Sequence, residues 1–254
     1  MARPLPTRSL GCRYDAGMGG RITSFDESVL ATFPVTLESL REQGILTPTV
    51  TVERLRDLLS PGQQAIFDQL MDLRPEDYGI STPYAGELEP VPDDLVEVTG
   101  QRYSEDGEEK TLGARYVPRH VFDAYRRMDT AFTADHPGSA LLIQSCYRSP
   151  AYQIATIIDW LINAYNGDIA VTVRHASPPR YSQHTIASKA AIDFKNVDGV
   201  PSGYRPEFFK DTVEYAWLRK HGAEFGFHES WQEGNDFGMR AEPWHWQYRA
   251  ISPA

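Results

Sequence analysis

Apolar side chains recur at helical spacing in the first third of the chain. Thr36 is a candidate N-cap for a helix that ends at Gly44, and a second apolar series begins at Thr51. The run Ser60-Pro-Gly-Gln63 is typical of a capping box, and it predicts a helix over residues 65–73. These stripes predict helices that pack against a common core.

Between residues 74 and 113 the chain becomes rich in Pro, Gly and acidic residues. Such segments form loops, linkers or exposed hairpins. We place a boundary near Pro90. It separates residues 1–90, an irregular arm over about the first 30 residues followed by helices of unknown role, from a second domain over residues 91–254.

Short strand patterns alternate with helices in the second domain. Helices are predicted after Pro118, after the cap Ser149, and from Pro206 to Gly222. Strands are predicted over residues 140–143, 169–173 and 190–194, and near Phe225 and Trp244. This order predicts an α+β fold, in which a small antiparallel sheet with flanking helices follows a mostly helical N-terminal region.

Composition narrows the class of protein. The chain has 254 residues, of which 41% are hydrophobic and 24% charged, as in ordinary globular proteins. The formal net charge of −10 argues against a general affinity for nucleic acid or for anionic membranes. No apolar run approaches the roughly 18 residues that a membrane span needs, and the basic N-terminus lacks the apolar stretch of a signal peptide.

Several common catalytic and metal-binding motifs are missing. The two cysteines, Cys12 and Cys146, are too few for a four-cysteine zinc site, so histidine and carboxylate would have to supply most ligands of a metal. None of the seven histidines lies in a His-Glu-x-x-His motif. The sequence also has no Gly-x-Ser-x-Gly elbow and no glycine-rich phosphate loop.

Three segments of the second domain carry the remaining candidate chemistry: residues 145–153, 182–193 and 242–248. They contain His184, Asp193 and His245, a ligand set that suits zinc with its fourth position open to water. On a strand, Asp193 points away from the face that Ile192 and Phe194 use for packing. A carboxylate in such surroundings is costly unless it is paired or bound to a metal.

Glu242 lies three residues before His245, so the two side chains converge only if the chain bends, which Pro243 would allow. A glutamate beside metal-activated water can act as a general base. Arg148 offers a fixed cation for a carbonyl oxygen or a carboxylate. Ser182 and Gln153 offer neutral hydrogen bonds.

Each of these residues also has an ordinary structural interpretation. A lone histidine such as His184 is often satisfied within the fold, and Asp193 can simply end a strand. Arg148 can form a surface ion pair, and Ser149 can serve only as a helix cap. Trp244 and Trp246 can belong to the core.

Taken together and in this order, the three segments resemble the zinc D,D-peptidases of the VanY type, within the LAS metallopeptidases. That family reads Ser-x-Tyr-Arg-Ser-x-x-x-Gln, then Ser-x-His-x-x-Gly-x-Ala-x-Asp, then Glu-Pro-Trp-His. The resemblance covers about residues 116–248, and Phe225-Gly-Phe227 is similar to the Tyr-Gly-Phe segment of the family.

The resemblance implies one Zn²⁺ per chain, held by His184, Asp193 and His245. It implies Glu242 as catalytic base and Arg148 beside the scissile carbonyl. Substrate contacts are expected from four residues of the matching motifs: Ser182, Gln153, Ser149 and Trp244. The expected substrate is the D-Ala-D-Ala end of peptidoglycan stem peptides, and the expected location is periplasmic or extracellular.

Two departures from the family pattern bear on the metal site. The step from His184 to Asp193 is two residues longer than in the family, and Ala187-Ser-Lys189 stands where the family has its turn glycine. Loops absorb insertions at small entropic cost, so the ligands can still converge. Cys146 replaces a glycine that is usual in the first motif, as neutral packing or as a thiol near the site.

Three alternative functions remain open. A peptidoglycan endopeptidase of phage-lysin type would share the fold but needs an open groove rather than a pocket for a terminal carboxylate. A non-catalytic cell-wall-binding relative would have a remodelled metal site that lacks the ion. A structural component would use the N-terminal helices as its working part.

Overall fold

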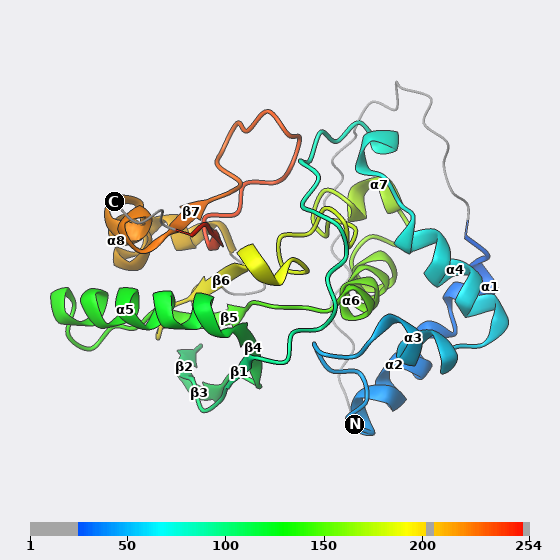
Figure 1. Ribbon diagram of the computed structural model, residues 1–254, viewed down its shortest axis with the longest axis horizontal. Coiled ribbons are helices and arrows are strands. Elements are labelled where there is room, and N and C mark those ends of the chain that lie inside the picture. Colours follow the sequence, from blue (N-terminus) through cyan, green and yellow to red (C-terminus); the bar gives the residue numbers. More distant parts are fainter. Residues whose placement is uncertain (1–24, 202–205, 251–254) are drawn as a thin grey trace.

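The computed structural model describes residues 25–201 and 206–250 as helices around small antiparallel sheets (Figure 1). The helices are α1 (Glu27–Leu30), α2 (Phe33–Glu42), α3 (Val52–Asp57), α4 (Pro61–Met71), α5 (Arg119–Asp135), α6 (Pro150–Asn163), α7 (Ile169–Thr172) and α8 (Val213–His221). Short 3-10 helices are η1 (Pro75–Tyr78), η2 (Ala187–Lys189), η3 (Pro206–Asp211) and η4 (Gly222–Phe225). The strands are β1 (Leu95–Val98), β2 (Arg102–Glu105), β3 (Glu108–Thr111), β4 (Arg115–Pro118), β5 (Leu142–Ser145), β6 (Ala191–Lys195), β7 (Phe227–Glu229) and β8 (His245–Tyr248). The predicted α+β class is confirmed.

Local capping explains where the N-terminal helices begin. The Thr51 hydroxyl accepts from the Arg54 amide, and Ser60 forms the expected reciprocal capping box with Gln63. The predicted cap at Thr36 is wrong, because α2 already begins at Phe33. The arm predicted for the first 30 residues lies mostly outside the described residues, and α1 occupies its end.

The acidic segment after Pro90 forms two antiparallel ribbons. β2 and β3 are joined at Asp106 and Gly107, whose φ angles of 54° and 80° place both residues in the left-handed region. Such a turn matches the twist of a two-residue hairpin. β1 pairs with β4, which leads directly into α5. Of the predicted alternatives of loops, linkers or exposed hairpins, β2 and β3 form an exposed hairpin.

The central sheet positions the candidate metal ligands. Its strand order is β5-β6-β8-β7, and every pair is antiparallel. Asp193 on β6 lies directly opposite His245 on β8, so both side chains share one face. Ile192 and Phe194 are fully buried on the other face, in a core that includes α5 and α8. The predicted orientation of Asp193 is therefore confirmed.

Two predicted elements differ from the structure. The strand predicted over residues 169–173 is wrong: this segment contains the one-turn helix α7, because the Asp168 carboxylate accepts from the Val171 amide and caps it. The single helix predicted from Pro206 is divided into η3 and α8, because the Thr212 hydroxyl caps a new helix through the Tyr215 amide.

A second core joins the N-terminal helices to α6 and α7. It contains Leu37, Phe67 and Leu70 from the first part of the chain and Ile154 and Ile158 from α6. Figure 1 shows α1–α4 gathered around α6, away from α5 and α8. The division near residue 90 stays a prediction, and apolar packing crosses it here. In the described part of the chain, no helix is both long and apolar enough to traverse a bilayer.

Candidate functional site

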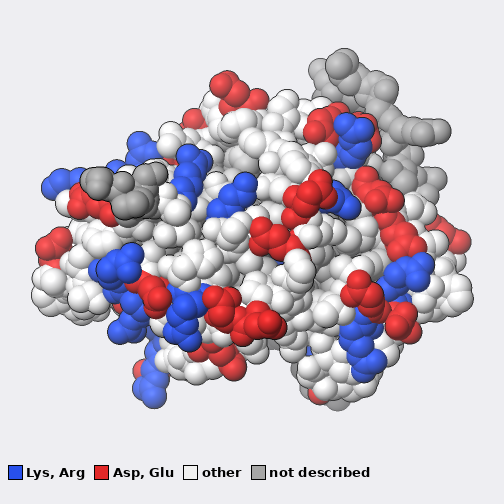
Figure 2. Space-filling model, viewed as in Figure 1, with Lys and Arg blue, Asp and Glu red and all other residues white. Residues whose placement is uncertain are grey.

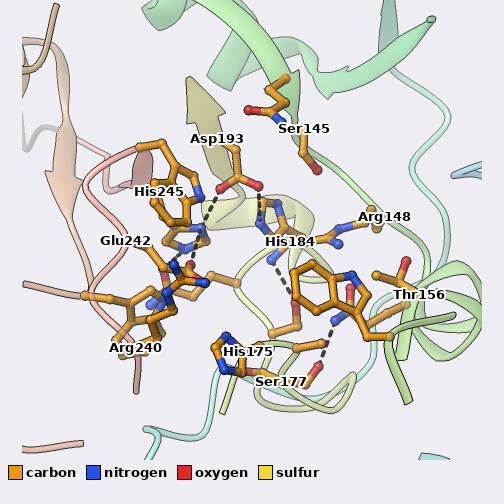
Figure 3. Close-up of a pocket in the computed structure, with 18 of the residues that line it drawn as sticks. Ser145, Arg148, Thr156, His175, Ser177, His184, Asp193, Arg240, Glu242 and His245 are labelled. Atoms are coloured by element: carbon orange, nitrogen blue, oxygen red, sulfur yellow. Dashed lines mark hydrogen bonds and ion pairs between the residues drawn. The ribbon is translucent and has the colours of Figure 1, made fainter. Parts of the chain in front are cut away.

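Two buried histidines and a half-buried aspartate meet on the open face of the central sheet. His184 comes from the loop before η2, Asp193 from β6 and His245 from the start of β8. One ligand atom from each lies within 4.8 Å of the others (Figure 3). The Asp193 carboxylate bridges the two rings, 3.3 Å from His184 Nε2 and 2.7 Å from His245 Nδ1.

The outward nitrogen of each ring faces an acceptor. His184 Nδ1 lies 2.8 Å from the Cys146 carbonyl oxygen, and His245 Nε2 lies 3.0 Å from Gln183 Oε1. Gln183 Oε1 also accepts from the Ser230 hydroxyl. The Asp193 carboxylate also only accepts, so each ring has an acceptor at both nitrogens, and binding of a metal at the inward nitrogens requires the ring proton on the outward one.

The charges of these side chains decide whether they fit a metal ion. Burial lowers the pKa of His184 to about 4, with Arg148 acting in the same direction, so the ring is neutral at neutral pH. Burial raises the pKa of Asp193, but its interactions with the two histidines outweigh burial and leave that pKa below its usual value. With the ring protons on the outward nitrogens, two lone pairs and a carboxylate face one another, and a divalent cation would satisfy all three. Two imidazoles and one carboxylate, with a position left open, fit zinc.

The longer connection between the first two ligands turns away from the site. Residues 187–189 form η2, and the Ser188 amide and hydroxyl both donate to the Glu89 carboxylate. The Ala191 amide donates to the Gln183 carbonyl oxygen and closes the turn at 3.0 Å. The two extra residues therefore leave His184 and Asp193 within reach of one ion.

Glu242 is brought to the triad by a β-turn. The His245 amide donates to the Glu242 carbonyl oxygen, and Pro243 takes the second position of this turn, so the predicted bend is confirmed. Glu242 Oε2 lies 3.9 Å from His245 Nδ1. Burial raises the pKa of Glu242 to about 7; His245 opposes the rise and Asp193 adds to it. Its carboxyl group is thus poised to exchange a proton near neutral pH.

A cavity of about 520 Å³ surrounds the triad, and Arg148, Gln153, Ser182 and Trp244 all line it. Among the described residues, no partner reaches Arg148 Nε or Gln153 Oε1, although both atoms are buried. Buried polar atoms without a partner are costly, which indicates a polar ligand in this cavity. The Ser182 hydroxyl faces the His184 amide at 3.3 Å.

Two residues of the first motif lie behind the cavity wall. Ser149 is fully buried, its hydroxyl accepts from the Tyr152 amide, and it does not line the cavity. This position makes Ser149 the cap of α6 and gives no support to its predicted contact with substrate. Cys146 is buried in the core, and burial raises the pKa of its thiol, so it acts as packing.

The cavity also has a wall that the sequence motifs do not reveal. It includes Trp160 from α6, Tyr165 and His175 on either side of α7, and Arg240 from the loop before Glu242. These residues have no fixed spacing from the metal ligands. The sequence around Trp160, Tyr165 and Arg240 therefore held no signal that could have identified this wall.

Comparison with known proteins gives one family. The family described as VanY, D-alanyl-D-alanine carboxypeptidase, matches residues 114–251. No curated protein matches the sequence.

Among solved structures, the chain is similar to the LD-carboxypeptidase LdcB, at 21% identity and a TM-score of 0.48, over 68% of this chain and 77% of that chain. It is similar to a mutant of the vancomycin resistance D,D-pentapeptidase VanY from the VanB-type cassette, in complex with Zn(II), at 20% identity and a TM-score of 0.41, over 66% and 87%. It is also similar to the L,D-carboxypeptidase DacB from Streptococcus pneumoniae, at 19% identity and a TM-score of 0.40, over 62% and 82%.

Proposed function

Because this chain belongs to the VanY D-alanyl-D-alanine carboxypeptidase family, we propose that it is a zinc enzyme that removes the terminal D-alanine from peptidoglycan stem peptides. The observation that carries the proposal is the convergence of two histidines and an aspartate, with Glu242 beside them, in one cavity. The same proposal implies a place of action outside the cytoplasmic membrane, where peptidoglycan lies.

In this proposal, Nε2 of His184, the Asp193 carboxylate and Nδ1 of His245 hold the metal. When bound, zinc supplies a Lewis acid that polarises the peptide carbonyl and lowers the pKa of water. Cys146 and Gln183 hold the two rings in the orientation that this binding needs, through the hydrogen bonds to their outward nitrogens.

Glu242 moves the proton. With a pKa of about 7, its carboxylate takes a proton from the attacking water and then delivers it to the nitrogen of the leaving D-alanine. Arg148 stabilises negative charge that develops on the carbonyl oxygen, because its buried guanidinium faces the same cavity. Ser182 and Gln153 orient the peptide through neutral hydrogen bonds.

The non-catalytic alternative requires a displaced ligand, and the ligand atoms of His184, Asp193 and His245 instead lie within 4.8 Å of one another. A peptidase that cleaves inside a cross-link differs from a carboxypeptidase in its product. Release of free D-alanine from a peptide that ends in D-Ala-D-Ala therefore separates the two activities.

The proposal is tested by metal analysis and a peptide assay on the same preparations. We expect about one zinc per chain in the wild type, and loss of zinc in His184→Ala and Asp193→Ala. Glu242→Ala should keep zinc and lose nearly all release of D-alanine, at least about a hundred-fold. The exposed Glu233 provides a matched control, since Glu233→Ala should retain both. A wild type that binds no zinc when zinc is supplied, or a Glu242→Ala variant with full activity, would refute the proposal.

A further inference from the structure

One wall of the cavity is made of stacked rings. The Trp160 and His175 rings are stacked with centroids 6.1 Å apart, and His175 stacks on Tyr165 at 4.9 Å. Trp160 remains 39% exposed although its ring lines the cavity. A large aromatic surface left open beside polar groups is typical of a place where part of a ligand rests.

Arg240 belongs to the same wall. It lines the same cavity as Tyr165, His175 and Glu242, and its positive charge acts on the pKa values of all three. In the view of Figure 3, Arg240 lies beside Glu242 on one side of the cavity and Arg148 on the other. A peptide held over the triad would therefore have a cation on each side.

The positive charge of this wall comes from Arg240, because His175 is neutral. Burial lowers the pKa of His175 to about 4, and Arg240 and Arg174 act in the same direction. At neutral pH the rings present an uncharged surface, and Arg240 carries its positive charge on a planar guanidinium.

The loop that carries Arg240 is held in place. Its neighbours Met239 and Trp231 are buried in the core shared with α6. Across the loop, Asn235 Nδ2 donates to the carbonyl oxygens of Gln232 and Met239, both at 2.9 Å. Such bracing reduces the entropy that Arg240 would lose on binding a ligand.

The arginines that line the cavity, and not the overall charge, favour an anionic group at this place. The chain has a net charge of −10, and acidic and basic side chains are interspersed on the face shown in Figure 2. Three arginines, Arg115, Arg148 and Arg240, nonetheless line one cavity, which also holds the carboxylates of Asp193 and Glu242. Cations gathered in a concave site attract an anion more strongly than dispersed surface charges do.

We propose that Arg240 and the ring wall of Trp160, Tyr165 and His175 form a subsite that binds a carboxylate of the substrate peptide, an inference that rests on the proposed peptidase function. The rings contact the apolar part of the residue that carries this carboxylate, and Arg240 binds its oxygens in a fork geometry. Arg240 is thus a specificity-determining residue, distinct in role from the catalytic Glu242. The carboxylate comes from one of two sources: the C-terminus of the peptide or an acidic side chain upstream of the scissile bond.

Three peptides distinguish these sources. The first ends in D-Ala-D-Ala with a free carboxylate and carries a glutamate two residues upstream. The second has a C-terminal carboxamide, and the third has glutamine in place of glutamate. We would measure kcat and KM with the zinc-loaded wild type, with Arg240→Gln and with Arg249→Gln. Arg249 is a matched control, because it is exposed and lies outside the cavity lining. Binding of the same peptides to zinc-loaded Glu242→Gln protein, with and without Arg240→Gln, is measured by calorimetry.

We expect the wild type and Arg249→Gln to prefer one carboxylate over its amide by at least about ten-fold in kcat/KM. Arg240→Gln should abolish that preference through KM, with kcat nearly unchanged, and the affected peptide identifies the source. A wild type without preference, or a preference that survives in Arg240→Gln, overturns the inference. An equal fall in kcat for all three peptides also overturns it, since Arg240 would then act only on Glu242.

The binding measurement separates this inference from the proposed function. Carboxylate-dependent binding that Arg240→Gln removes, together with no hydrolysis by the wild type, would support the subsite and refute the peptidase. Hydrolysis without any role of Arg240 would refute the subsite alone. A wild-type protein that neither binds nor cleaves the peptides refutes both.

Discussion

Replacement of Glu242 by glutamine should stabilise the metal-free protein, and by an amount that grows with pH. Burial raises the pKa of this carboxyl from 4.5 to about 7 in the folded protein. Between these values the native protein binds more protons at Glu242 than the unfolded chain does, so the contribution of this group to stability falls as the pH rises. Glutamine has a similar shape and no charge, and it removes this dependence.

The magnitude follows from the shift in pKa. Two to three pKa units correspond to about 3 kcal/mol once the group is fully ionised in both states. Glu242→Gln should therefore be more stable than the wild type by about 3 kcal/mol at pH 8.5. At pH 5, where the native group is protonated, the gain should be below about 1 kcal/mol.

Urea unfolding of chelator-treated protein, followed by tryptophan fluorescence, measures this difference directly. Other titrating groups contribute equally to both proteins and cancel in the difference between wild type and variant. Glu233→Gln, which removes an exposed carboxylate, should show a difference that does not change with pH. A difference for Glu242→Gln that stays constant from pH 5 to 8.5 would refute the argument that this carboxylate is buried beside Asp193.

Two further predictions concern residues that support the site. Gln183→Leu removes the acceptor of His245 Nε2, so the affinity for zinc should fall roughly 10- to 100-fold. Competition with a chelator measures this affinity, and an unchanged value would contradict the orienting role of Gln183. Ser149→Ala removes the cap of α6, so it should lower the free energy of unfolding by about 1 kcal/mol without changing KM. A raised KM at unchanged stability would instead support a contact between Ser149 and the substrate.

Local sequence signals were sufficient to predict the helices that begin at a side-chain cap. The Ser60 capping box and the Ser149 cap begin helices through hydrogen bonds within four residues, so short-range pattern was sufficient. The two-residue period of a strand likewise predicts that Asp193 and Phe194 point to opposite faces of the sheet. Sequence order also placed Glu242 next to His245, because the intervening proline is compatible with a turn.

Tertiary packing decided what these local signals could not. Residues 169–173 alternate like a strand, but a segment of this length is compatible with either period, and the Asp168 cap together with the core around α6 makes it helical. The same packing brings α1–α4 against α6, across the boundary that composition suggests. The Asp168 cap is a local signal that the alternation of residues 169–173 outweighed in the prediction, whereas the packing around α6 depends on contacts between residues distant in sequence, which periodicity does not encode.

The cavity shows the same division. The motifs predicted the three metal ligands. The fold of η2 against Glu89 decided whether His184 and Asp193 still meet despite the longer turn between them. Arg240 and the ring wall have no motif, because α6, α7 and a braced loop bring them together only in three dimensions. Sequence alone thus determined the chemistry offered to a metal, and tertiary structure determined the shape and charge of the space around it, because that space is bounded by elements from the whole chain.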